Sequence, residues 1–250
     1  MAKKGFILLL TTFMVLCFTS LVMAHDVKSN IVSKLQGKWH DINGNAILNI
    51  QDNTVNGCAI VGIYQPAGGG SDFSCIIRII EADGYRDLSV IGENLQNDSY
   101  HAHIILNGNN QTNRESTLLM KTKAAKCYES IGGIGLDMTE KEVLTKYGNP
   151  DQIQHLKPWS HLDTWKYEKL GLELTMRYQR VWIIKIYKNG NRHFDRTGLN
   201  CANEIYEFQS AYRFNRIPRA GQYGAYSVGH GEYLWFDNYP NSITMSMLNH

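Results

Sequence analysis

The sequence predicts an α+β protein in which an N-terminal antiparallel β-sheet or small barrel precedes a C-terminal tandem helix-plus-antiparallel-sheet repeat. Short apolar segments separated by Asn- and Gly-rich turns predict the N-terminal strands. A pattern that occurs twice predicts the repeat: Gly135-Leu136 matches Gly198-Leu199, Pro150 matches Pro218, and Gly171 matches Gly231. A unit of this size cannot bury its own apolar face, so we expect the two copies to share one core.

Residues 1–24 have the pattern of a secretory signal peptide. Lys3 and Lys4 precede an apolar run that ends near Cys17, and a cleavage site follows at Ala24. This order is typical of export, and the run is too short and wrongly flanked for a membrane anchor. Leu16 stands where a lipoprotein signal needs a small residue. We therefore expect a soluble exported protein, periplasmic or extracellular, that begins at about His25.

Charge and length bound the rest of the chain. The sequence has 25 basic and 23 acidic residues, and loss of Lys3 and Lys4 leaves it formally neutral. Neutrality argues against nucleic-acid binding and against adhesion to anionic lipid. No later apolar run is long enough to span a bilayer. About 225 residues suit two modest domains, placed at 25–126 and 127–250, with half-repeats at about 130–192 and 193–250.

The strands of the N-terminal domain are expected in order along the chain. The segment from Gly37 to Asp41 runs into the turn signal Asn43-Gly44, and the segment from Ala46 to Ile50 returns from it. Further strand-like segments follow at 55–64, 73–80, 85–91, 100–106 and 116–123. Regular short strands separated by turn residues predict an antiparallel sheet or barrel.

Each half of the C-terminal domain is expected to hold a short helix and a hairpin. The first helix opens near Asp137 with an acidic first turn, which suits the helix dipole, and Asn149-Pro150 ends it. The second helix spans roughly 202–213, where apolar residues recur at helical spacing.

Four cysteines remain after the signal segment, and an even number in an exported chain predicts disulfides. Three pairings are possible. We favour Cys58–Cys75, because both lie on neighbouring strand-like segments, and Cys127–Cys201, because each lies near the start of one repeat. No pair has CxxC spacing, which argues against metal or redox chemistry at these residues.

No motif predicts catalysis, and we expect neither a cofactor nor a metal. His101 and His103 alternate along a strand-like segment and so share a face, but spacing indicates no third metal ligand. We expect two solvated histidines. No Gly-x-Ser-x-Gly or His-Glu-x-x-His pattern occurs, and no cysteine has a recognised nucleophile setting.

The two hairpins predict a binding face. Alternation puts Leu174 in the core and Glu173 and Arg177 outside, and alignment of Gly171 with Gly231 places Tyr233, Trp235 and Asp237 on the same outer face. Large aromatics on a solvated face are typical of interface centres. The predicted binding residues are Tyr233, Trp235, Asp237, Arg177 and Glu173. The alternative is that the other domain, or the loop from Arg213 to Tyr223, covers Trp235.

Two resemblances to known families extend this interpretation. The pattern from Gly135-Leu136-x-Met138-Thr139 to Tyr147-Gly148-x-Pro150, continued by Trp165-x-Tyr167, resembles the small outer-membrane-assembly lipoproteins and is similar to the tandem-repeat β-lactamase inhibitory proteins. It covers about residues 130–250. The resemblance implies paired helix-and-sheet units whose aromatic sheet face binds a protein without catalysis. The chain departs from these lipoproteins because it lacks a lipidated Cys and carries a β-rich domain in front.

The second resemblance concerns the N-terminal domain. Leu35-x-Gly37-x-Trp39 resembles the opening of lipocalin-like barrels, which implies a barrel plugged by Trp39 that holds a small apolar ligand. The sequence thus predicts an exported, non-catalytic module that binds another protein of the envelope or exterior. A lipocalin-like carrier and a hydrolase without a recognisable motif remain as alternatives, and the oligomeric state is open.

Overall fold

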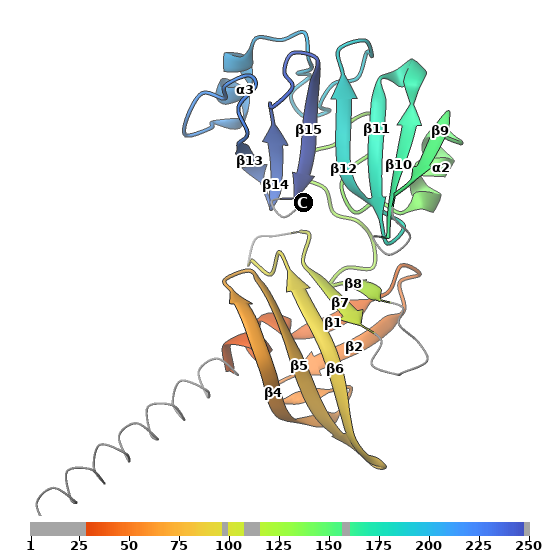
Figure 1. The fold of residues 1–250 in the computed structure, drawn as a ribbon, viewed down its shortest axis with the longest axis vertical. Helices are drawn as coiled ribbons and strands as arrows, with labels where there is room; N and C mark the ends of the chain where they lie inside the picture. The colour runs from red at the N-terminus through yellow and green to blue at the C-terminus, as the bar shows by residue number, and fades with distance from the viewer. Residues whose placement is uncertain (1–28, 97–99, 108–115, 157–160, 248–250) are drawn as a thin grey trace, which may run out of the picture.

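The computed structural model describes residues 29–96, 100–107, 116–156 and 161–247, and the expected signal peptide at 1–24 lies outside them. Two domains follow each other along the chain. Strands β1 to β8 form a closed barrel, and strands β9 to β15 form a seven-stranded sheet. Figure 1 shows the barrel and the sheet end to end.

The barrel consists of eight antiparallel strands in chain order, with a helix at 29–35 before them. Each strand pairs with the next, and β8 closes the barrel through the pairing of Met120 with His40 on β1. Asn56 and Gly57 both have positive φ, 52° and 84°, so they form the tight turn that suits a hairpin. The strands are β1 (Gly37–His40), β2 (Ala46–Gln51), β3 (Thr54–Val55), β4 (Cys58–Gly69), β5 (Asp72–Glu81), β6 (Gly84–Glu93), β7 (His103–Asn107) and β8 (Thr117–Met120).

Side chains fill the barrel. Along β5 every second residue is buried, from Phe73 to Ile79, because alternate side chains of a strand point inward. Trp39 is fully buried, and its indole Nε1 donates a hydrogen bond to the Leu35 carbonyl at 2.8 Å. Leu35 itself comes from the preceding helix, so helix and strands pack into one apolar cluster.

The second domain is a single sheet with the order β13-β14-β15-β12-β11-β10-β9. The first four strands run in chain order from β9 at one edge to β12 in the middle, and the last three strands complete the sheet on the other side through the pairing of β15 with β12. The elements are α2 (Glu140–Tyr147), β9 (Gln152–His155), β10 (Leu162–Tyr167), the 3₁₀ turn η1 (Glu168–Leu170), β11 (Leu172–Arg177), β12 (Arg180–Tyr187), α3 (Ile205–Tyr212), β13 (Ala225–Gly229), β14 (Glu232–Trp235) and β15 (Ser242–Met247).

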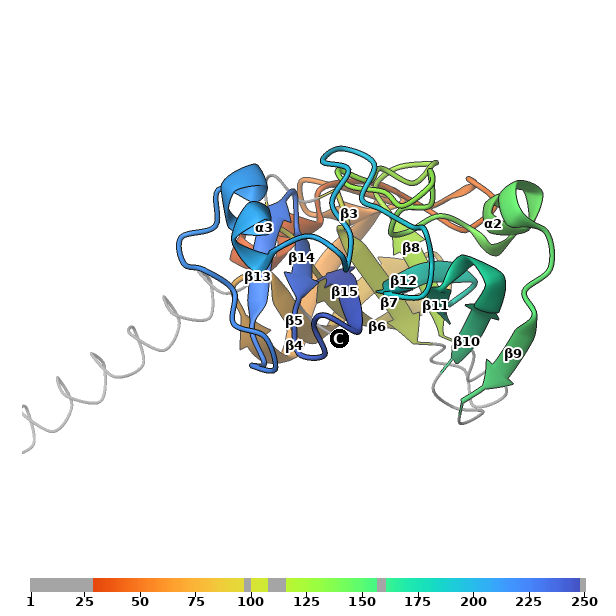
Figure 2. The same ribbon diagram turned by 90° about the horizontal axis from the view of Figure 1, so that it is seen from above.

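One face of this sheet is covered and the other is open. Helices α2 and α3 lie on the same side of the sheet in Figure 2. On that side Leu174 and Met176 from β11 share one buried cluster with Leu234 and with Phe236, which follows β14. Thr139 caps α2 and exchanges hydrogen bonds with Glu142, which is a local reason for the helix to begin there.

The predicted α+β class with a tandem helix-plus-sheet repeat is wrong, because the chain is mostly β. Helices α2 and α3 have eight residues each, or about two turns. Both halves of the domain join one continuous sheet, and they contribute four and three strands. Strands β9 and β13 are not among the expected elements. Their residues form strands because they pair with β10 and β14.

Among the described residues, no helix has both the length and the apolar character needed to cross a membrane.

Candidate functional site

The five predicted binding residues do not form one surface. Tyr233 and Trp235 lie on β14 and Asp237 follows them, whereas Glu173 and Arg177 lie on β11. Strands β15 and β12 separate the two groups, which at about 4.8 Å per strand puts them roughly 14 Å apart. A single small contact therefore cannot include all five residues.

Trp235 is not available as an exposed anchor. Its side chain is only 6 % exposed, and its indole Nε1 donates to the Ser246 hydroxyl on β15 at 2.7 Å. The ring of Tyr223 lies over it, with centroids 4.9 Å apart. The loop from Arg213 to Tyr223 therefore covers Trp235, as the alternative interpretation of the sequence expected. Tyr233 beside it is half-buried, and Asp237 is exposed in the turn before β15.

Arg177 and Glu173 have partners within the protein. The Arg177 guanidinium forms two hydrogen bonds, of 3.0 and 3.1 Å, to the carboxylate of Glu93 at the end of β6, and it stacks 4.1 Å from the ring centroid of Trp182. Arg177 therefore joins the sheet to the barrel. Glu173 accepts a hydrogen bond from the Tyr187 hydroxyl at 3.1 Å on the open face of the sheet.

Next to Trp235, the aromatic residue that faces solvent is Tyr223, which is 78 % exposed. It belongs to residues 213–224, here named the arginine loop, which connects α3 to β13. The loop also presents Ile217, Arg216 and Arg219 to solvent. A hollow of about 590 Å³ is lined by Arg216, Ile217, Arg219, Gln222, Tyr223 and Tyr226.

The arginine loop is held in place at several points. Phe214 and Pro218 are buried, and the Gly221 N–H donates to the Phe236 carbonyl at 3.1 Å. The ring of Phe214 packs 5.3 Å from that of Tyr226. A loop that is tethered in this way has little conformational freedom to lose when a partner binds.

The sequence contains a signal for this loop that strand alternation does not include. Between Phe208 and Gly231 the chain has three arginines and no Asp or Glu. In a chain that is otherwise neutral, such a stretch indicates a local basic surface.

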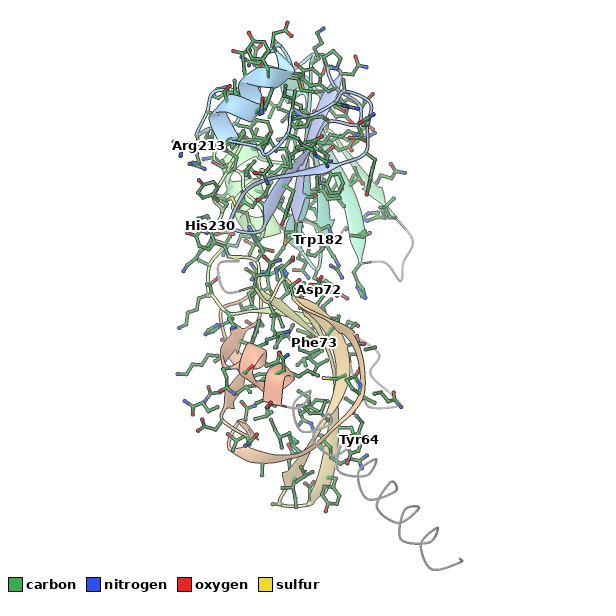
Figure 3. All side chains as sticks on the ribbon, turned by 90° about the vertical axis from the view of Figure 1, so that its left-hand side faces the viewer. Tyr64, Asp72, Phe73, Trp182, Arg213 and His230 are labelled. Atoms are coloured by element: carbon green, nitrogen blue, oxygen red, sulfur yellow. The ribbon has the colours of Figure 1, made fainter. Side chains whose placement is uncertain are left out.

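A second group of polar residues lies at the junction of the two domains and is named the charge cluster: His101, His103, Asp137 and Glu232. All four side chains are essentially fully buried. His101 contacts Asp137 through Nδ1 and Glu232 through Nε2, the latter at 3.0 Å, and His103 Nε2 lies 2.8 Å from the other Asp137 oxygen. Figure 3 labels Trp182 and His230 at the end of the sheet domain that faces the barrel, and Asp72 at the facing end of the barrel.

Burial and pairing set the protonation of this cluster. Burial alone would lower the pKa of His101, but the Asp137 charge and hydrogen bonds to Asp137 and Glu232 raise it to about 9. Burial would likewise raise the pKa of Asp137, and the neighbouring histidines instead hold it well below its usual range. His101 is therefore a cation at neutral pH that bridges two carboxylates. The Glu232 carboxylate also accepts the N–H groups of Tyr128 and Glu129, at 2.6 and 2.8 Å.

The expectation of two solvated histidines is thus wrong. His101 and His103 do share a face, but that face points into the junction because Asp137, far away in sequence, supplies the anion. In the part of the chain that the structure describes, no set of three His, Cys, Asp or Glu side chains could hold a metal ion.

The predicted disulfides are not formed, and Cys58, Cys75, Cys127 and Cys201 are free thiols in the structure. Strands β4 and β5 are indeed neighbours, but Ile60 pairs with Ile79, so Cys58 at the start of β4 is far from Cys75 along the ladder. That offset of several residues corresponds to well over 10 Å at about 3.3 Å per residue. Cys201 is buried, with its thiol directed at the Ile186 carbonyl, while Cys127 is exposed and packs beside Gly135.

No family model matches the chain, and no significant match is found among curated proteins or solved structures.

Proposed function

We propose that this protein is an exported, non-catalytic module that binds another protein of the cell envelope or exterior through the arginine loop and the neighbouring strand β14. The signal-like segment at 1–24 supports export. The observation that carries the binding site is Tyr223: it is the exposed ring of a tethered loop, it packs at a tilt against the buried Trp235, and it shares its hollow with Arg216 and Arg219. Tyr, Trp and Arg are the residue types enriched at the centres of protein interfaces.

Two further observations favour this function over the alternatives. The side chains inside the barrel pack on one another, which favours a structural role for the barrel over a small-ligand carrier. The charge cluster is sealed between the domains, so its histidines and carboxylates are placed to hold the domains together and not to meet a substrate.

The proposal can be tested by site-specific photo-crosslinking in the native cells. A benzophenone amino acid at position 223 is expected to give one discrete adduct, because that side chain lies at the docking surface. The matched control is position 85 on the barrel, where Tyr85 is also strongly exposed, at 70 %. Equal labelling of many proteins from both positions, or no adduct from 223, would contradict the proposal.

A further inference from the structure

We infer that the arginine loop binds an acidic segment of its partner, a stretch of Asp or Glu side chains beside an apolar one. This inference rests on the proposed function and names the chemistry of the partner. Its starting point is an imbalance of charge. In the described residues, no carboxylate forms an ion pair with Arg213, Arg216 or Arg219, although all three are exposed.

Of the six other described arginines, Arg78, Arg86 and Arg177 form ion pairs with a carboxylate, and Arg180, Arg192 and Arg196 do not. Arg78 is bound in a bidentate manner by Asp87, at 2.7 and 2.8 Å, and Arg177 is bound in the same way by Glu93. Arg86 contacts Glu81 at 3.1 Å. Asp237 lies near the arginine loop, yet the described structure records no ion pair between it and the loop arginines. The loop thus concentrates three cationic groups that have no carboxylate partner among the described residues.

The geometry of Arg216 favours a carboxylate as the partner. Its guanidinium carbon lies 5.3 Å from the ring centroid of Tyr226, so the aromatic ring supports the guanidinium. Stacking against a ring leaves the N–H edge of an arginine free for bidentate hydrogen bonds to a carboxylate. Arg219 lines the same hollow, and Ile217 and Tyr223 offer apolar surface next to both.

The same features disfavour a nucleic acid. A chain that binds a phosphate backbone normally carries a broad basic surface, whereas this chain has 23 acidic residues against 25 basic ones. Arg216 and Arg219 line one hollow of about 590 Å³, which suits one or two carboxylates and an apolar side chain, the size of a short peptide segment.

Fluorescence anisotropy of the purified protein tests this inference. The probe is a short labelled peptide of Asp, Glu, Phe and Leu, and its control has Asn and Gln in place of the acids. We expect the acidic peptide to bind at least about tenfold more tightly, with affinity that falls as salt rises, because charge-assisted hydrogen bonds are strong and screened. The double variant Arg216→Gln/Arg219→Gln should weaken binding about tenfold, and Tyr223→Ala should weaken it by a smaller factor.

A matched pair of variants controls for net charge. Arg86→Gln/Lys38→Gln removes two cations from the barrel and should leave affinity unchanged within about twofold. Equal binding of the two peptides, equal loss in both double variants, absence of saturable binding, or tighter binding of a single-stranded oligonucleotide of the same charge would each overturn the inference. If the crosslink at position 223 persists in Arg216→Gln/Arg219→Gln and is insensitive to salt, the proposed docking function is supported and the inference of an acidic partner segment is wrong. If the acidic peptide binds but position 223 gives no adduct, the loop binds carboxylates and the proposed docking function is wrong.

Discussion

The charge cluster and the arginine loop use ionisable side chains in opposite ways. At the domain junction His101, Asp137 and Glu232 are sealed from water, and each has a hydrogen-bonded counter-charge. In the arginine loop Arg216 and Arg219 stand in solvent, and no described carboxylate pairs with them. A buried charge must be paired, since an unpaired one costs several kcal/mol, while an exposed charge has little effect on stability whether or not it is paired.

This difference separates what holds the molecule together from what is available to a partner. Loss of a charge at the junction leaves a buried partner without compensation and should affect folding. Loss of a charge in the loop should leave folding intact and affect only binding. Three experiments on stability test this distinction.

The largest effect is expected for Asp137→Asn. Asp137 has a positive φ of 65°, which Asn tolerates, so this change removes the charge without adding backbone strain. His101 would then lose one of its two counter-charges while buried, and the free energy of unfolding should fall by about 3–5 kcal/mol. Urea denaturation measures the loss. Asp163→Asn, which removes the exposed partner of His155, should cost less than about 1 kcal/mol, and comparable losses in both variants would contradict the assigned role of the cluster.

A somewhat smaller effect is expected for the aromatic pair that borders the loop. Trp235→Ala empties a buried site and leaves the Ser246 hydroxyl without its donor, so stability should drop by about 3 kcal/mol. Tyr223→Ala removes an exposed ring and should change stability by less than about 1 kcal/mol. Thermal melts of the two variants provide the comparison. If Trp235→Ala is as stable as the wild type, Trp235 is not part of the core and the predicted role as an exposed binding residue is correct.

The smallest of the three effects is a dependence on pH. His101 has a pKa of about 9 in the folded protein against an ordinary 6.5, so the folded state binds its proton more tightly. The resulting stability is fully present below pH 6.5 and is lost as pH rises through 9, by at most about 1.4 kcal/mol per pH unit and roughly 3 kcal/mol in all. Denaturation midpoints at intervals between pH 6 and 9.5 should show this decline in the wild type. His101→Gln should flatten it, and an unchanged slope in that variant would assign the decline to other groups.

The candidate site could be predicted from the sequence only in part. The alternation that placed Tyr233 and Trp235 on the outer face of a strand is local, and β14 has it. Whether that face is open depends on the loop that folds back over it, and no local pattern indicates that Tyr223 packs against Trp235. The run of three arginines without an acid was visible in the sequence, but its lack of partners is a property of the folded chain.

Local residue patterns determined the turns, the positions of most strands of the first domain and the cap of α2, because hydrogen bonds and alternation within a few residues decide them. Tertiary structure alone decided that the repeated pattern becomes one sheet with short helices, that the cysteines stay apart, and that His101 meets Asp137 and Glu232. These outcomes depend on strand register and on contacts between residues 36 to 131 positions apart, and register between distant segments is set by the packing of the whole core.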